Sequence, residues 1–187
     1  MANEPRIPFI TEVSPELEEL FGKARLRDGP PLNIFRTLGH HPRLFKRFNL
    51  LGGLLLTDGL LPAREREIVI LRVGWRSGSV YEFGQHTLIG KGVGLTDDEI
   101  RRLASPDVAG WGELDGLLVS FADELCAGND VSDATWAVLE GRLGPAELVE
   151  LLVVAGFYRL VSGFLRSARV PLDEGVPGWP EGTSPPS

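Results

Sequence analysis

Apolar residues recur along this chain at the three- and four-residue spacing of amphipathic helices, and this pattern constrains the fold more than any other feature. The run from Leu114 to Leu125 is the clearest case, because Leu118 and Phe121 continue the period and Gly128 follows its end. No stretch alternates apolar and polar residues convincingly enough to predict a strand. The sequence therefore predicts an all-α fold, a helical bundle.

Local start and stop signals divide the chain into these helices. Predicted starts are Ser14-Pro15, Asn33, His41-Pro42, Pro62, Ser79, Thr96 with Glu99 as a capping box, Ser132 and Gly144-Pro145. With 187 residues, of which 43% are hydrophobic, one sizeable core is the default. We expect one domain over residues 1–175 and an extended or mobile tail over the Pro/Gly/Ser-rich residues 176–187.

The last predicted helix is apolar nearly all round, from Leu148 to Leu160. Such a helix must be covered on several sides, so it is either central to the monomer or shared with a neighbouring subunit. Together with Leu50 to Leu56 it offers more apolar surface than a monomer of this size would leave open to water. We therefore expect self-association into a homotrimer or homohexamer, or at least a dimer.

Charge and cysteine content exclude several classes of function. The net charge of −7, with no basic tract, predicts no binding to nucleic acid or to an anionic membrane. Cys126 is the only cysteine, so neither an intrachain disulfide nor a redox Cys-x-x-Cys pair can form. The first residues lack a secretion-signal pattern, and charged residues interrupt the most apolar stretch. These observations favour a soluble, cytoplasmic protein.

The stretch REREIVILRVGWRSGSVYEFGQH, residues 64–86, concentrates the candidate chemistry. Ser79, Glu82 and His86 share one face of the second helix, near its start. Ser79 and Glu82 can form a capping box, and Glu82 can instead accept a hydrogen bond from the His86 imidazole. His86 is either a hydrogen-bonded core residue or an acid/base group, because histidine titrates near neutral pH. Glu67 either pairs with neighbouring arginines on a solvated face or takes part in the chemistry.

This stretch resembles the signature of the carboxymuconolactone decarboxylase and alkylhydroperoxidase D-like superfamily, on REREIVILRVGWR, YEFGQH and the following GLTDDEI. In the peroxidase branch a glutamate, a Cys-x-x-Cys pair and a histidine follow one another at fixed spacing. Glu67 and His86 stand in the glutamate and histidine places, whereas Ser79 and Glu82 replace the cysteines. The flanking residues resemble the decarboxylase-type branch, and the resemblance extends loosely over residues 30–175.

The resemblance implies an alkylhydroperoxidase D-like bundle and a cofactor-free lyase of the 4-carboxymuconolactone decarboxylase type, as used in aromatic compound catabolism. Its substrate would be a small lactone or carboxylic acid, with His86 as the group that moves protons and Glu67 and Glu82 as catalytic partners. Two alternatives are an antioxidant alkylhydroperoxidase, disfavoured because a hydroxyl and a carboxylate cannot cycle through a disulfide, and a non-catalytic oligomer that binds small molecules.

Four further residues are candidate substrate contacts. Arg72 and Arg76, one helical turn apart, could hold a substrate carboxylate, although solvated surface arginines are the commoner case. Tyr81 could wall the pocket or belong to the core, and Ser79 could face the ligand. His40-His41 has no further ligands at metal-site spacing, so we predict no metal.

Overall fold

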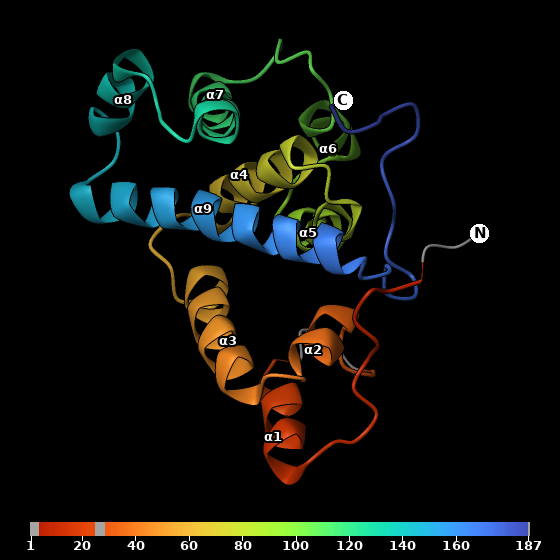
Figure 1. The fold of residues 1–187 in the computed structure, drawn as a ribbon. Helices are drawn as coiled ribbons and strands as arrows, with labels where there is room; N and C mark the ends of the chain where they lie inside the picture. The colour runs from red at the N-terminus through yellow and green to blue at the C-terminus, as the bar shows by residue number, and fades with distance from the viewer. Residues whose placement is uncertain (1–3, 25–28, 187) are drawn as a thin grey trace.

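The computed structural model describes residues 4–24 and 29–186, and all regular structure within them is α-helical (Figure 1). The predicted all-α fold is confirmed. The helices are α1 (Pro15–Lys23), α2 (Asn33–Leu38), α3 (Pro42–Thr57), α4 (Ala63–Arg76), α5 (Val80–Gly92), α6 (Asp97–Leu103), α7 (Glu113–Gly128), α8 (Asp133–Glu140) and α9 (Pro145–Ala168).

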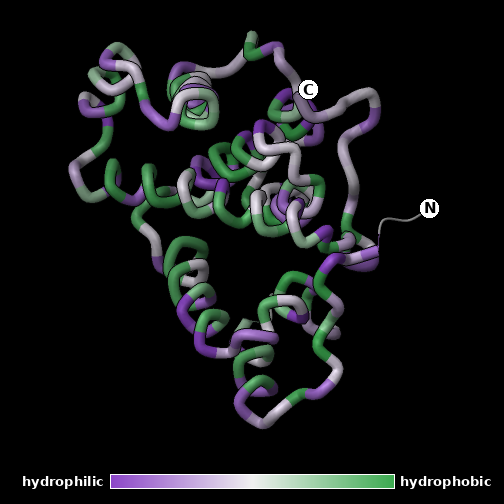
Figure 2. The backbone as a smooth tube through the Cα atoms, in the orientation of Figure 1, coloured by the Kyte–Doolittle hydropathy of each residue, from purple (hydrophilic) through white to green (hydrophobic). Residues whose placement is uncertain are grey.

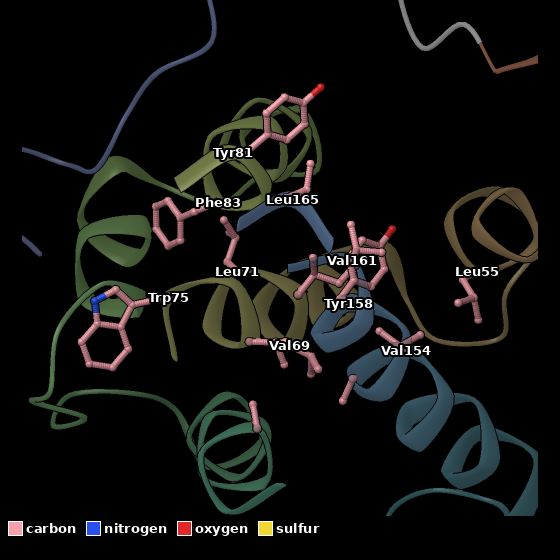
Figure 3. Packing of buried hydrophobic residues seen from close by; sticks show 14 of the residues in the cluster. Leu55, Val69, Leu71, Trp75, Tyr81, Phe83, Val154, Tyr158, Val161 and Leu165 are labelled. Carbon is pink, nitrogen blue, oxygen red and sulfur yellow. The ribbon is translucent and has the colours of Figure 1, made fainter. Parts of the chain in front are cut away.

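Helix α4 is the centre of the bundle. It packs against α5, α6, α7 and α9, and every residue from 66 to 75 is buried. Its apolar side chains, such as Val69 and Leu71, meet those of α5 and α9 in one continuous core (Figure 3). The most apolar helix, α9, is instead buried on one face only, because Val149, Val153 and Leu160 remain exposed.

The arginine at position 72 is buried inside this core. Its guanidinium binds the Asp123 carboxylate of α7 at 2.6 and 2.7 Å and donates to the carbonyls of Leu103 and Ser105 at 3.1 and 2.6 Å. It also lies over the Trp75 ring, 4.4 Å from the ring centre. Because four of its five N–H groups are bonded, Arg72 fixes α7 and the end of α6 to α4.

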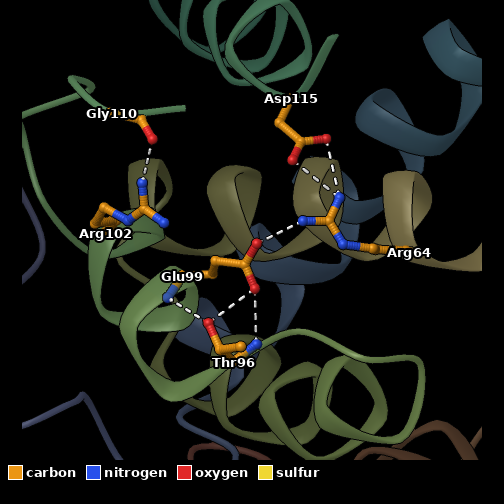
Figure 4. Close-up of polar contacts among 6 residues, drawn as sticks. All are labelled: Arg64, Thr96, Glu99, Arg102, Gly110 and Asp115. Carbon is orange, nitrogen blue, oxygen red and sulfur yellow. Dashed lines mark hydrogen bonds and ion pairs between the residues drawn. The ribbon is translucent and has the colours of Figure 1, made fainter. Parts of the chain in front are cut away.

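The first turn of α4 is held by a second arginine. Arg64 binds Glu99 of α6 at 2.5 Å and Asp115 of α7 at 2.9 and 3.0 Å (Figure 4). Glu99 also completes the capping box with Thr96, as the sequence predicted. The same carboxylate therefore starts α6 and ties it to α4.

Helices α1, α2 and α3 form an arm that packs on itself (Figure 1). The arm meets the body through α3 and α9, where the ring centres of Phe48 and Phe157 lie 5.0 Å apart, and through two carboxylates. The Asp173 carboxylate accepts hydrogen bonds from the Asn33 backbone, the Tyr81 hydroxyl and the Gln85 amide. At the other end Glu150 of α9 accepts from the backbone N–H groups of residues 60 and 61, at 2.7 and 2.9 Å. These contacts set the distance between α3 and the body, which is where a cavity lies.

The C-terminal segment, residues 176–186, is extended and packs on α4 and α5. Val176 is buried, Trp179 lies with its ring centre 5.0 Å from that of Phe83, and Trp75 donates to the Ser184 carbonyl at 2.8 Å. The segment passes so close to α5 that only glycine fits at position 84. Of the predicted tail 176–187, Ser187 lies outside the described residues.

Within the described ranges α9 alone is long and apolar enough to cross a membrane by length and composition. In the body of the structure, however, 44% of its most apolar window is buried. Hydrophobic residues recur along α9 and also along α3 (Figure 2). Part of the apolar character of α9 therefore serves the core of the domain.

Gly84→Ala should loosen the C-terminal segment. A Cβ at this position would lie 2.2 Å from the Pro177 carbonyl oxygen and 2.8 Å from a Val176 methyl carbon. We expect a loss of about 1–3 kcal/mol in the free energy of unfolding, measured by urea denaturation, and faster proteolysis of the tail. Gly92→Ala on the same helix is the matched control, because its Cβ would meet nothing within 4 Å. Equal stability of the two variants would contradict this account of the packing.

Candidate active site

The two residues at the centre of the site come from adjacent helices. Glu67 of α4 and His86 of α5 meet through Oε2 and Nδ1 at 2.6 Å, and their exposed fractions are 0% and 6%. The second Glu67 oxygen accepts from Arg66 Nε at 3.3 Å. An ionised carboxylate only accepts, so His86 Nδ1 carries the proton in this bond. This arrangement leaves His86 Nε2 for chemistry.

A cavity of about 280 Å³ lies beside this pair, between the arm and the body. His86, Glu82 and Tyr158 form part of its wall, and the Tyr158 ring meets the imidazole edge-on with centres 4.8 Å apart. The remaining wall is largely apolar and includes Phe48, Leu56, Ile89, Phe157 and Val161, with Lys23, Asn49 and Gln85 as polar members. Its volume and composition suit a small, largely apolar ligand with few polar groups.

Glu82 is the unusual member of this wall. It is 2% exposed, and neither carboxyl oxygen makes a hydrogen bond. The buried Ser162 hydroxyl of α9 lies beside it, equally without a hydrogen bond. Burial raises the pKa of Glu82 well above its usual range, and the neighbouring hydroxyl offsets little of this shift. Burial therefore favours the neutral form of the Glu82 carboxyl.

The expected capping box at the start of α5 is absent, and so is the expected hydrogen bond between Glu82 and His86. Ser79 is the N-cap residue but its side chain accepts no capping hydrogen bond, and its hydroxyl is buried without a partner. The Glu82 side chain turns instead toward Gly74 of α4, where a Cβ would lie 3.4 Å from its Oε1. The imidazole Nδ1 is bonded to Glu67 and not to Glu82.

The remaining candidate contacts are separated by the fold. Arg72 is bound to Asp123, Arg76 lies 3.6 Å from the same carboxylate, and neither lines the cavity. Tyr81 does line it, but its hydroxyl donates to Asp173 and accepts from the Ile34 N–H. Its phenol is thus fully bonded, and its pKa is raised by burial and by the Asp173 carboxylate. Ser79 lies outside the cavity wall.

Two contributors to the site come from distant parts of the chain and were not predicted: Asp173 places the arm, and Ser162 lies beside Glu82. Arg66, which supports Glu67, is one of the neighbouring arginines that the sequence offered as its partners. The pattern RER before the apolar run was the only local signal, because it put arginine next to Glu67. Cys126 lies on α7 away from the cavity, and burial raises the pKa of its thiol.

Comparison with known proteins gives one family match. Residues 42–113, which include Glu67, Glu82 and His86, match the model of the carboxymuconolactone decarboxylase family. No curated protein sequence matches the chain.

Several solved structures share the fold over nearly the whole chain. A peroxidase-related protein from Silicibacter sp. TM1040 has a TM-score of 0.80 at 15% identity, over 91% of each chain. A peroxidase-related protein from Ralstonia eutropha JMP134, described as an alkylhydroperoxidase AhpD core, has 0.79 at 19% identity, over 91% of this chain and 93% of that one.

A third structure holds a ligand. It is a cysteine-to-alanine variant of the debrominase Bmp8 in complex with 2,3,4-tribromopyrrole, with a TM-score of 0.78 at 12% identity, over 93% of this chain and 95% of that one. At such identities the structural likeness establishes the fold, and the family match adds the sequence signature around the Glu67–His86 pair. The match over residues 42–113 and the shared fold support a place in the carboxymuconolactone decarboxylase and alkylhydroperoxidase D-like superfamily.

Proposed function

We propose that this protein is a cofactor-free acid/base enzyme of the carboxymuconolactone decarboxylase type, acting on a small lactone or carboxylic acid. The observation that carries the proposal is the buried Glu67–His86 pair at 2.6 Å, with His86 in the wall of an apolar cavity. A carboxylate that fixes the tautomer and orientation of a histidine is the usual support for a group that moves protons. The debrominase complex supports a small ring as the ligand class.

In the proposed reaction the imidazolium of His86 supplies a proton to carbon. The bond between a substrate carboxylate and its carbon breaks, carbon dioxide leaves, and the electron pair stays on the carbon, delocalised into the lactone carbonyl. Nε2–H of His86 then protonates that carbon, which leaves a neutral imidazole still held by Glu67. The apolar wall favours this step. The localised charge of the substrate carboxylate is destabilised when it loses its hydration there, whereas the charge of the carbanion is delocalised and is destabilised less.

His86→Gln should remove the proton-moving group and lower turnover by roughly 10²–10⁴-fold, whereas Glu67→Gln should cost less, because it only orients the ring. Thermal-shift screening of lactones and carboxylates selects a substrate, and carbon dioxide release measures turnover.

His40→Gln, at an exposed histidine, is the matched control and should leave turnover unchanged. A folded His86→Gln variant with near-parental turnover would reduce His86 to a core residue, and binding without turnover in the parent protein would favour the non-catalytic alternative.

Glu82→Gln should stabilise the protein at neutral pH but not in acid. Because the folded-state pKa of Glu82 is raised, the native state keeps its full stability below about pH 4.5 and loses it as pH rises toward that pKa. The glutamine cannot ionise, so its advantage should grow by up to about 1.4 kcal/mol per pH unit in this window. Urea denaturation at several pH values measures it, with exposed Glu140→Gln as control. If the difference in unfolding free energy between the variant and the parent protein did not change with pH, the raised pKa of Glu82 would be contradicted.

The hydroperoxidase alternative makes an opposite forecast. Cys126 is single, half-buried and outside the cavity wall. We expect no peroxide consumption above buffer with a dithiol reductant, and no change in any activity on Cys126→Ser. Robust peroxide turnover that Cys126→Ser abolishes would move the hydroperoxidase function to first place.

A further inference from the structure

One face of α9 is exposed and carries no charge over most of its length. Its members, here called the α9 stripe, follow one another at alternating spacings of three and four: Ala146, Val149, Val153, Gly156, Leu160 and Gly163. Val149, Val153 and Leu160 are 62%, 40% and 59% exposed. In Figure 1 α9 passes in front of α4, and no other helix of the described chain lies in front of it.

The outer face of a helix in a globular domain normally carries polar residues, and the α9 stripe does not. The alternation of three and four is the heptad spacing with which one helix packs along another. At 1.5 Å per residue the stripe runs about 26 Å along the helix. Its inner face is already used by the core, so the stripe is a second packing surface on the same helix.

Neither close packing nor backbone conformation within the described residues requires glycine at the two glycine positions of the stripe. A Cβ at Gly156 or at Gly163 would meet nothing within 4 Å, and neither residue has a positive φ. Glycine in a helix interior costs about 1 kcal/mol relative to alanine. Glycine is favoured where another backbone approaches closely, so these positions point to a partner helix.

The stripe is complementary to itself when two copies run antiparallel. If Gly156 of one copy lies on Gly156 of the other, Val149 faces Gly163 and Val153 faces Leu160, so that a large side chain meets a glycine or an apolar neighbour. The same register brings Glu147, near the start of α9, beside Arg166, near its end. A parallel pairing would place the Glu147 carboxylates against each other.

We propose that a second copy of this chain packs antiparallel on the α9 stripe, across a two-fold axis at Gly156. Such a contact is isologous: the same residues serve both copies. Phe157, Tyr158 and Val161, adjacent to the stripe on α9, line the cavity. The second copy would therefore hold one wall of the cavity in place, although the interface itself requires no catalytic function.

Cysteine cross-linking tests the register. In a Cys126→Ser background oxidised with diamide, Gly156→Cys should form a disulfide with itself. Val149→Cys and Gly163→Cys should each stay single, because their copies would lie about 21 Å apart along the axis. A mixture of these two variants should give the heterodimer. Self-linking of Val149→Cys and Gly163→Cys, each alone, would indicate a parallel pair and overturn the proposal.

Association of the uncross-linked protein provides the second test, by analytical ultracentrifugation. Leu160→Glu buries two unpaired carboxylates at the seam and should raise the dissociation constant by at least about 100-fold. Val138→Glu, at a 46% exposed valine of α8, is the matched control and should associate like the parent protein. A parent protein that is monomeric at micromolar concentration overturns the proposal, and monomers that bind phosphatidylcholine vesicles would assign the stripe to a membrane surface instead.

Discussion

The structure depends on the burial of a helix that carries charges. Residues 66–75 of α4 are all buried, and they include Arg66, Glu67 and Arg72. A buried charge without a partner costs several kcal/mol, so each of these side chains must meet a group of opposite sign or a set of hydrogen bonds. Arg72 obtains both from Asp123 and two carbonyls, which fixes α7 and the end of α6 against α4.

The need of buried charged groups for partners also determines the geometry of the candidate active site. Glu67 is fully buried, and its two oxygens accept from Arg66 and His86. The contact that compensates a buried carboxylate is thus also the contact that orients an imidazole toward the cavity. Glu82 has no such compensation, and burial raises its pKa, which favours the neutral form. The two glutamates therefore have different environments: Glu67 is bonded to His86 and Arg66, whereas neither oxygen of Glu82 has a hydrogen-bond partner.

Helix boundaries could be predicted from the sequence because their signals are local. Thr96 with Glu99, Ser132 and Gly144-Pro145 start helices where expected, and each needs only residues within one turn. The partners of buried charges could not be predicted in this way. Arg72 and Asp123 lie 51 residues apart, and the expected substrate contact at Arg72 was lost to that pairing. The Ser79–Glu82 capping box could not be judged from local residues either, because the Glu82 carboxyl lies beside Gly74 of the preceding helix instead.

Composition left open whether α9 is central to the monomer, and the structure places α4 at the centre. α9 is the more apolar helix and α4 is the more buried one, because charges can enter a core when partners meet them there. Several apolar residues of α9 stay exposed outside the core. They follow heptad spacing, in line with two glycines at which an added Cβ would meet no atom of the described residues within 4 Å. A random surplus of apolar residues would have neither property. Self-association remains a prediction, and the α9 stripe is where we propose that it occurs.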